Sequence, residues 1–210
     1  MLRVKNVSVK IEAIKILEDI DIEIKGFSSI IGRNGAGKTT LMKTIMNILK
    51  PEKGEILFND LKISRLETHK MTSYGIGYMP EDRKLVPELS VKDNLLMPLW
   101  ASKNLDESKK LENTLSFIPE LKPFLNREAY QLSGGQQKLV ALGRALIIGS
   151  NLLLLDEPFE GVAPALAERL VELIKELSKM DVITLITESD DTYSKKIGAK
   201  VFRIERGKII

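Results

Sequence analysis

Apolar and polar residues alternate along the first part of the chain with the two-residue period of β-strands. Apolar side chains recur between residues 2 and 9 and again between 16 and 24, as in strands with one face on a core. Their closeness predicts an antiparallel pair. A short apolar run at 28–31 follows, and the apolar spacing at 39–49 predicts a helix that Pro51 stops.

The rest of the chain alternates between helices and strands, except for one long helical stretch. Residues 91–130 show helical apolar spacing without a strand signal, which predicts a helical subdomain at about 88–134, inserted in a single domain spanning 1–210. The other elements expected are strands at 54–58, 76–79, 152–155, 182–187 and 200–210, and helices at 136–148 and 165–179. This order predicts an α/β fold with a mainly parallel sheet, helices on both faces and an antiparallel β subdomain.

Composition excludes several classes of function. The net charge is only 32 − 29 = +3 and the charges are interleaved, so no nucleic-acid partner is expected. The chain has no cysteine, which excludes disulfides, thiolate metal sites and cysteine nucleophiles. Its apolar runs are far shorter than the roughly 18–20 residues that span a bilayer. No apolar block of the signal-peptide type opens the sequence, so we expect a cytosolic location.

A glycine-rich run lies between a predicted strand and a predicted helix. The sequence GRNGAGKT at 32–39 fits the pattern G-x-x-x-x-G-K-[ST]. In this pattern backbone N–H groups and the positive end of the helix hold phosphates, the lysine reaches the terminal phosphates, and the hydroxyl binds Mg²⁺. A P-loop NTPase core is therefore predicted. The predicted nucleotide-binding residues are Gly32, Arg33, Asn34, Gly35, Ala36, Gly37, Lys38, Thr39 and Thr40.

Two acidic residues end the most apolar predicted strand. Four consecutive leucines at 152–155 precede Asp156 and Glu157. Burial explains the leucines but not carboxylates at the end of the strand, where α/β sheets bind their ligands. We therefore predict that Asp156 holds the metal with Thr39, and that Glu157 orients or deprotonates a water beside the γ-phosphate.

A third motif, LSGGQQK at 132–138, precedes a predicted helix. Together the three motifs resemble those of ABC-type ATPases, in order, over nearly the whole chain. Ser133, Gly134 and Gly135 suit a second anion site. The resemblance implies that this segment contacts ATP held by a second ATP-binding subunit, so that two ATPs lie in a head-to-tail dimer. It also implies transmembrane permease partners, an indirect role for an external substrate-binding protein, and a peripheral location at the cytoplasmic face of the cell membrane.

Two details resemble the ATP-binding subunits of branched-chain amino-acid importers. The run from Asp156 to Pro164 reads DEPFEGVAP, with Gly and Ala-Pro where most relatives have Ala-Leu-Asp, and the strand IGYM at 76–79 leads through Pro80 to Glu81 instead of glutamine. A carboxylate at Glu81 suits a magnesium-bound water, so we include Glu81 in the predicted metal site. A different polar substrate, such as an amide or urea, stays open, as does a dimer of identical or different chains.

One departure from the family pattern concerns catalysis. Most relatives have a histidine after the last core strand, but the only histidine here is His69. Ser189 occupies the corresponding place, and its uncharged hydroxyl donates a weaker hydrogen bond. We therefore expect slow hydrolysis in which Lys38, Ser189 and the base Glu157 take part.

Two other functions compete with an importer ATPase. A soluble ABC-type ATPase acting on ribosomes or DNA would usually carry two cassettes, a long coiled-coil insertion or basic extensions, none of which occurs in this sequence. A degenerate nucleotide switch without turnover would fit Glu81 and Ser189, but Lys38, Asp156 and Glu157 argue against it. The apolar residues Leu96, Met97, Leu99 and Trp100 suit either a groove for a membrane-subunit helix or core packing.

Overall fold

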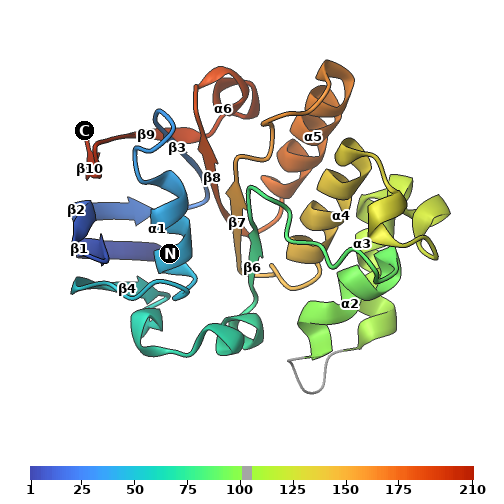
Figure 1. The fold of residues 1–210 in the computed structure, drawn as a ribbon, viewed down its shortest axis with the longest axis horizontal. Helices are drawn as coiled ribbons and strands as arrows, with labels where there is room; N and C mark the ends of the chain where they lie inside the picture. Colours follow the sequence, from blue (N-terminus) through green and yellow to red (C-terminus); the bar gives the residue numbers. More distant parts are fainter. Residues whose placement is uncertain (101–105) are drawn as a thin grey trace.

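An antiparallel sheet forms one side of the protein (Figure 1). The computed structural model describes residues 1–100 and 106–210. The sheet has the strand order β2-β1-β4-β5, with every neighbouring pair antiparallel. Its strands are β1 (Leu2–Ile11), β2 (Ile14–Ile24), β4 (Lys53–Phe58) and β5 (Leu61–Lys62).

A second, mainly parallel sheet passes through the middle of the molecule and carries the candidate site at one edge. Its order is β10-β9-β3-β8-β7-β6, and only the pair formed by β9 and β10 is antiparallel. The register pairs Ile31 with Glu188 and Asp156 with Thr187, so the carboxyl ends of β3, β7 and β8 lie together. The strands are β3 (Phe27–Ile31), β6 (Ile76–Met79), β7 (Leu152–Asp156), β8 (Ile183–Glu188), β9 (Lys200–Glu205) and β10 (Lys208–Ile209).

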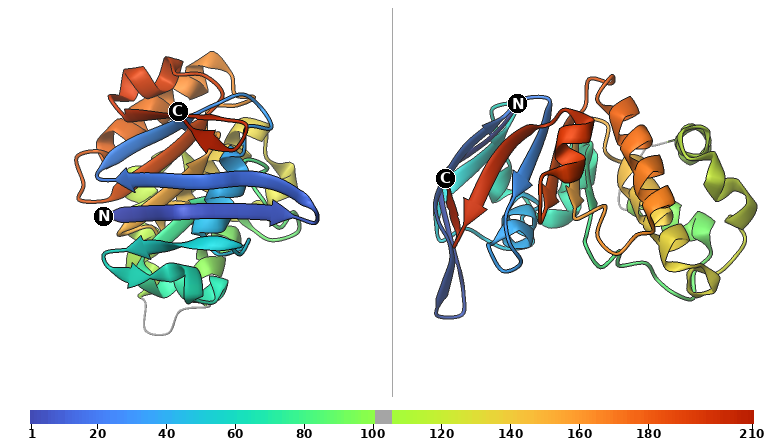
Figure 2. Two further views of the ribbon diagram at one scale, coloured as in Figure 1. Left: turned by 90° about the vertical axis from the view of Figure 1, so that its left-hand side faces the viewer. Right: turned by 90° about the horizontal axis from the view of Figure 1, so that it is seen from above.

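Helices cover both faces of this second sheet. Helix α1 contacts β2 on one side and β7 and β8 on the other, so it lies between the two sheets, whereas α4 packs against β6 and β7. Helices α2 and α3 lie beyond α4, away from the antiparallel sheet (Figures 1 and 2). The helices are α1 (Lys38–Ile45), α2 (Val91–Trp100), α3 (Glu107–Phe117), α4 (Gly134–Leu146), α5 (Pro164–Leu177) and α6 (Thr192–Ile197). Short 3₁₀ helices are Ile63–Arg65, Thr68–Tyr74, Pro119–Phe124 and Ala129–Gln131.

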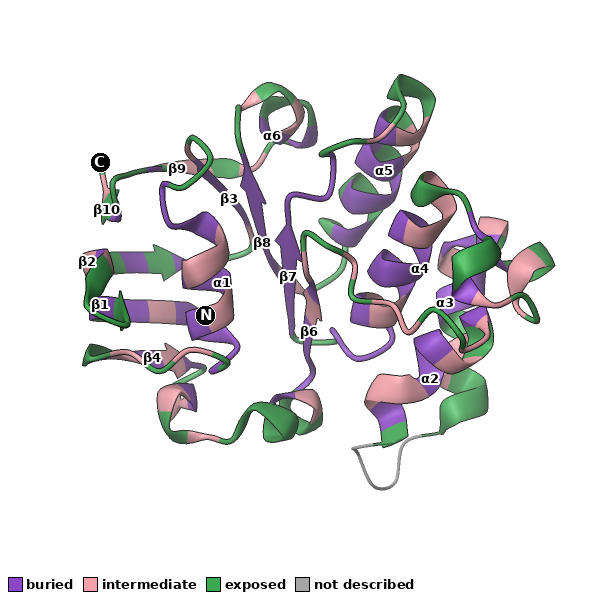
Figure 3. Cartoon of the chain, in the orientation of Figure 1, coloured by how far each residue is buried: buried purple, intermediate pink, exposed green. Residues whose placement is uncertain are grey.

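The parallel sheet separates two hydrophobic cores, which explains the four consecutive leucines. Because side chains alternate along a strand, Leu152 and Leu154 pack in the core on the α1 side. Leu153 and Leu155 pack in the other core, with α4 and α5. All four are fully buried, and β7 is buried along its whole length in Figure 3.

The structure confirms the predicted α/β class and every predicted strand, with shifts of a few residues at the ends. The helix predicted at 39–49 ends earlier, because Asn47 takes a positive φ of 60° and Ile48 and Leu49 donate their N–H groups to the Lys43 carbonyl. Helix α6 and the 3₁₀ helices were not predicted. The subdomain boundaries 88–134 stay a prediction, and residues 101–105 within them lie outside the described residues.

Candidate nucleotide-binding site

The glycine-rich loop connects β3 to α1 at the carboxyl edge of the parallel sheet. A Cβ atom on Gly32 would lie 2.4 Å from the carbonyl oxygen of Ile204, so a larger residue does not fit. Gly37 has a φ of 109° and lets the chain turn directly into α1. No side chain in the described ranges caps this helix. Its first N–H groups therefore point toward the loop without a side-chain acceptor, as an anion site requires.

Two cavities flank this loop. The first, of about 380 Å³, brings together residues that the sequence assigned to nucleotide, metal and catalysis, and its lining is Ile16, Asn34, Gly35, Gly37, Lys38, Thr39, Thr40, Glu81 and Glu157. The second, of about 650 Å³, is lined in part by Gly32, Arg33, Ala36 and Ser189. Each of the predicted nucleotide-binding residues at 32–40 therefore lines at least one of these two cavities.

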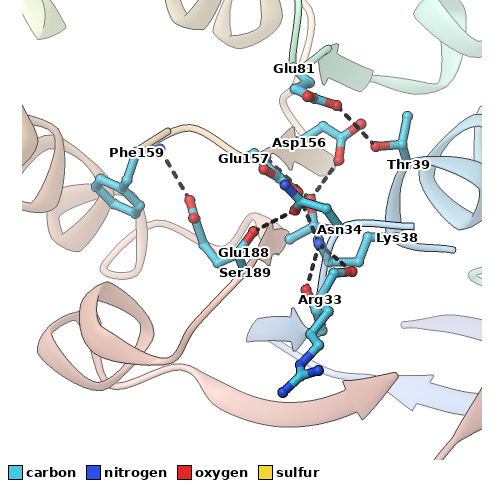
Figure 4. Close-up of polar contacts among 12 residues, drawn as sticks. Arg33, Asn34, Lys38, Thr39, Glu81, Asp156, Glu157, Phe159, Glu188 and Ser189 are labelled. Carbon is cyan, nitrogen blue, oxygen red and sulfur yellow. Dashed lines mark hydrogen bonds and ion pairs between the residues drawn. The ribbon is translucent and has the colours of Figure 1, made fainter. Parts of the chain in front are cut away.

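Lys38 and Glu157 form a buried ion pair at the base of the first cavity (Figure 4). Lys38 Nζ lies 3.0 Å from Glu157 Oε1, with side-chain exposures of 3% and 5%. The same Nζ donates to the carbonyl oxygens of Gly32 at 2.6 Å and Arg33 at 3.2 Å. Burial raises the pKa of Glu157, but the Glu160 carboxyl and the Lys38 ammonium lower it more, so its net pKa is below the ordinary value. Glu157 is therefore held as a carboxylate.

Asp156 ends β7 and is fully buried. Its Oδ1 accepts a hydrogen bond of 2.6 Å from the Thr187 hydroxyl, and its Oδ2 accepts one of 3.2 Å from the Tyr78 hydroxyl. Burial raises the pKa of Asp156. Hydrogen bonds from the two neighbouring strands, β6 and β8, therefore orient the Asp156 carboxylate.

The three residues predicted to hold a metal lie together. The Thr39 hydroxyl donates to Glu81 Oε2 at 3.4 Å, and Asp156 lies beside both in Figure 4. Against the larger effect of burial, which raises the pKa of Asp156, the nearby Thr39 hydroxyl lowers it. Oxygen ligands of this type, few in number and next to a phosphate site, suit Mg²⁺. Thr39, Asp156 and Glu81 can therefore hold that ion.

Ser189 lines the second cavity, whereas Glu81 lines the first. It is exposed, follows β8 directly, and its hydroxyl donates to Asn34 Oδ1 at 3.0 Å. This places a hydroxyl beside the phosphate loop, as predicted from its sequence position.

The segment Ser133–Gly135 begins helix α4. The Ser133 hydroxyl accepts from the Gln136 N–H at 3.3 Å, and Gln136 Oε1 accepts from the Ser133 N–H at 2.9 Å, which forms a capping box. Arg83 Nη1 donates to the Gly134 carbonyl at 3.3 Å. In the described part of the chain, this segment does not line the phosphate-loop cavity. The contact of Ser133–Gly135 with a nucleotide held by a second subunit stays a prediction.

Several residues of the site were not predicted from the sequence. Lys138, Thr187 and Glu188 all contact the turn that follows Asp156, and Glu160 lies within it. Carboxylate oxygens of Glu81, Glu157 and Glu160 all lie within 4.8 Å of one another. The nearby Glu157 carboxyl raises the pKa of Glu160 to about 7. The sequence carried no clear signal for these residues, because Lys138 follows two glutamines and Glu188 stands between Thr187 and Ser189, which are surroundings typical of exposed side chains.

The fold and this site define a class: a nucleotide-binding P-loop domain with its loop, lysine and paired acids at one sheet edge. A protein-family profile described as "ABC transporter" matches residues 18–160. The chain belongs to the ABC transporter family and is an ATP-binding, ATP-hydrolysing domain of that family. The predicted ABC-type ATPase is therefore confirmed.

Relatives and solved structures agree with this membership. The chain is 31% identical to the high-affinity branched-chain amino acid transport ATP-binding protein BraG of Pseudomonas aeruginosa, covering 100% of this chain and 91% of BraG. It is also 31% identical to the xylose/arabinose import ATP-binding protein XylG of Sulfolobus acidocaldarius, covering 100% of this chain and 86% of XylG. A dimeric bacterial ABC transporter cassette superimposes with a TM-score of 0.89 at 26% identity, covering 100% of this chain and 96% of that one.

None of the helices within 1–100 and 106–210 combines the length and the apolar character needed to cross a membrane.

Proposed function

We propose that this chain powers an importer of branched-chain amino acids, or of a similar small polar substrate, from the cytoplasmic face of the cell membrane. Support comes from the similarity to BraG and to a probable branched-chain amino acid transport protein of Archaeoglobus fulgidus, which is 29% identical. Glu81 and the sequence DEPFEGVAP add to it. Sugar import and lipopolysaccharide export proteins also match. The proposed substrate class therefore depends on Glu81 and the sequence DEPFEGVAP as well as on the overall similarity. Because the relatives are transport proteins, a ribosome- or DNA-directed ATPase is not favoured.

The observation that carries the catalytic assignment is the buried contact between Lys38 and Glu157. Both residues line the cavity of about 380 Å³ beside the phosphate loop. The lowered pKa of Glu157 keeps a proton acceptor there at neutral pH. ATP entering the cavity offers Lys38 a phosphate oxygen in place of the carboxylate. Glu157 can then accept the proton of a water that attacks the γ-phosphate.

The other predicted site residues have supporting roles in this proposal. Thr39, Asp156 and Glu81 would hold Mg²⁺, and the bound ion would neutralise charge on the phosphates. The N–H groups of the loop at 32–40 bind phosphate oxygens, and the Ser189 hydroxyl, beside Asn34, donates to the γ-phosphate. An uncharged donor at this place supports slow hydrolysis.

The test of the base is phosphate release by the purified chain with Mg-ATP. Glu157→Gln keeps the size of the side chain and removes the proton acceptor, so turnover should fall by about 10²–10⁴-fold while ATP still binds. The control is Glu176→Gln, which changes an exposed acid on α5 and should leave turnover unchanged. Full activity in Glu157→Gln would refute the base assignment. No release by the unmodified chain at any concentration, with ATP still bound, would mean that the site needs a different partner subunit or that this chain is a switch without turnover.

A large apolar cavity supports membrane subunits as partners. It measures about 840 Å³, and Met46, Ile48, Leu49, Met97 and Pro98 contribute apolar lining. Leu96 and Leu99 are instead buried in the core, and Trp100 is 56% exposed, so of the four apolar residues noted in the sequence only Met97 lines this groove. We assign the groove to a helix of a permease subunit.

Uptake by the complete transporter tests the substrate. The chain would be reconstituted with its membrane subunits and external receptor in proteoliposomes, and uptake of labelled leucine compared with arabinose and molybdate. ATP-dependent leucine uptake that disappears with Glu157→Gln is expected. Uptake of arabinose or molybdate instead would overturn the substrate class and leave the ATPase assignment intact.

A further inference from the structure

We propose that Lys138 is a positioning residue that joins the start of helix α4 to the turn 157–160 and thereby sets Glu157 for catalysis. The inference rests on the proposed function in that Glu157 is taken as the base, and the link to a second nucleotide also rests on the predicted contact of Ser133–Gly135. It concerns a side chain that lies outside the phosphate-loop cavity.

Lys138 is buried and donates to two backbone carbonyls. It lies in the second turn of α4, five residues after Ser133, and is 4% exposed. Its Nζ donates to the carbonyl oxygen of Glu157 at 2.8 Å and to that of Glu160 at 2.7 Å. A buried ammonium group is costly unless its hydrogen bonds are made. These two contacts therefore hold both ends of the turn to α4.

The turn needs support because its backbone is strained. Glu157 has a φ of 48°, in the left-handed region, which costs a residue with a side chain about 1–3 kcal/mol and persists only when its surroundings enforce it. On the sheet side, the Glu157 N–H donates to the Thr187 carbonyl at 3.1 Å and lies 3.2 Å from its hydroxyl. The Phe159 N–H donates to Glu188 Oε1 at 3.1 Å. Strand β8 thus holds the N–H groups of Glu157 and Phe159, and Lys138 holds the carbonyls of Glu157 and Glu160. The Glu160 N–H donates within the turn, to the Glu157 carbonyl at 3.3 Å.

The direction in which the Glu157 side chain leaves the turn depends on this backbone. Its Oε1 lies 3.0 Å from Lys38 Nζ, and both side chains are almost fully buried. If Lys138 no longer held the carbonyls, the turn would relax and the carboxylate would sample positions away from the attacking water. Misplacing a catalytic group by about 1 Å can cost on the order of 10²-fold in rate.

The placement of Lys138 also connects two functional segments of one chain. Ser133–Gly135, five to three residues before it, is the segment predicted to meet ATP held by the second subunit. Movement of α4 on that contact reaches the Glu157 turn through the two hydrogen bonds of Lys138.

The test uses Lys138→Met, which keeps the stem and removes the donors, and Lys138→Arg, which restores a cationic donor. For Lys138→Met we expect kcat to fall by at least about tenfold, with KM and ATP affinity within about threefold. Lys138→Arg should recover part of kcat. Lys175→Met removes an exposed lysine of α5 and is the control for loss of charge.

Amide hydrogen exchange supplies a readout that does not require activity. The amides of Glu157, Phe159 and Glu160 should exchange at least about tenfold faster in Lys138→Met, while those of α1 do not change. If Lys138→Met does not fold, Lys138→Gln, which keeps one donor group, replaces it.

Either wild-type kcat in Lys138→Met or unchanged exchange of the turn amides would overturn the proposal. A loss of activity accompanied by faster exchange throughout the protein would also overturn it, because Lys138 would then be only a structural residue. If Glu157→Gln proved fully active, the base assignment would fail, but the exchange experiment would still decide whether Lys138 holds the turn.

Discussion

At the scale of single residues, Glu188 makes stability depend on pH. Its side chain is buried at the end of β8, and burial raises its pKa to about 8, with a further contribution from the Glu157 charge. The folded protein therefore holds a proton that the unfolded chain releases above about pH 4.5. Stability from this group is complete below that pH and is lost as the pH rises toward about 8.

Glu188→Gln should remove this loss, because glutamine stays neutral and still offers an oxygen to the Phe159 N–H. We expect the free energy of unfolding, measured by denaturant titration from pH 5 to 9, to fall less steeply with pH in the variant. The difference should reach roughly 2–5 kcal/mol at pH 9. Glu160, with a pKa of about 7, leaves a smaller slope in both proteins. Glu205→Gln, an exposed change, is the control, and parallel pH curves for wild type and Glu188→Gln would contradict the prediction.

At the scale of elements, the contact between β6 and α4 depends on a glycine. A Cβ on Gly77 would lie 2.1 Å from the Ala145 carbonyl oxygen and 2.9 Å from the Gly149 Cα. These are backbone atoms, so Gly77→Ala must push the helix away from the strand. We expect a loss of about 1–3 kcal/mol or more in the free energy of unfolding, measured by denaturant titration.

Gly26→Ala separates this steric effect from backbone strain. Gly26 has a φ of 65° but open space around its Cβ position, so only the conformational cost of about 1–2 kcal/mol applies. In Gly77→Ala we also expect altered near-ultraviolet signals from the core, whereas Gly26→Ala should keep them. An unperturbed, fully stable Gly77→Ala would show that α4 and β6 are less closely packed than in this structure.

At the scale of the whole molecule, we propose a head-to-tail dimer of identical chains, which predicts complementation between two inactive variants. Lys38→Met lacks the lysine of the phosphate loop. Ser133→Asp retains a helix cap, since aspartate caps as well as serine, but places a negative charge where phosphate is expected. Each variant alone should release almost no phosphate.

An equal mixture should recover activity, because every mixed dimer contains one site with both an intact loop and an intact start of α4. Since about half of the dimers are mixed, with one complete site in two, recovery of up to about a quarter of wild-type activity is expected. Lys38→Met mixed with Glu157→Gln is the control, because the sole intact loop then lacks its base. Recovery in that control, or none in the test mixture, would contradict the head-to-tail arrangement.

The sequence predicted those features of the structure that depend on neighbouring residues in the chain. The phosphate loop, Asp156 and Glu157 were recognisable because their residues are adjacent and follow a strand with a strong apolar pattern. Helix α6 was missed because its six residues, Thr192–Ile197, are too few to show a helical period. The early end of α1 depended on the positive φ of Asn47, for which the apolar pattern has no signal.

The sequence by itself determined the α/β class, the order of the strands along the chain and the chemistry available at the sheet edge, because alternation and short motifs act over a few residues. Only the tertiary structure decided which distant groups surround that chemistry. Lys138 is 19 residues from Glu157, and Thr187 is 30. Their hydrogen bonds and the burial of Glu188 arise when α4, β7 and β8 pack together, and no local pattern encodes that register.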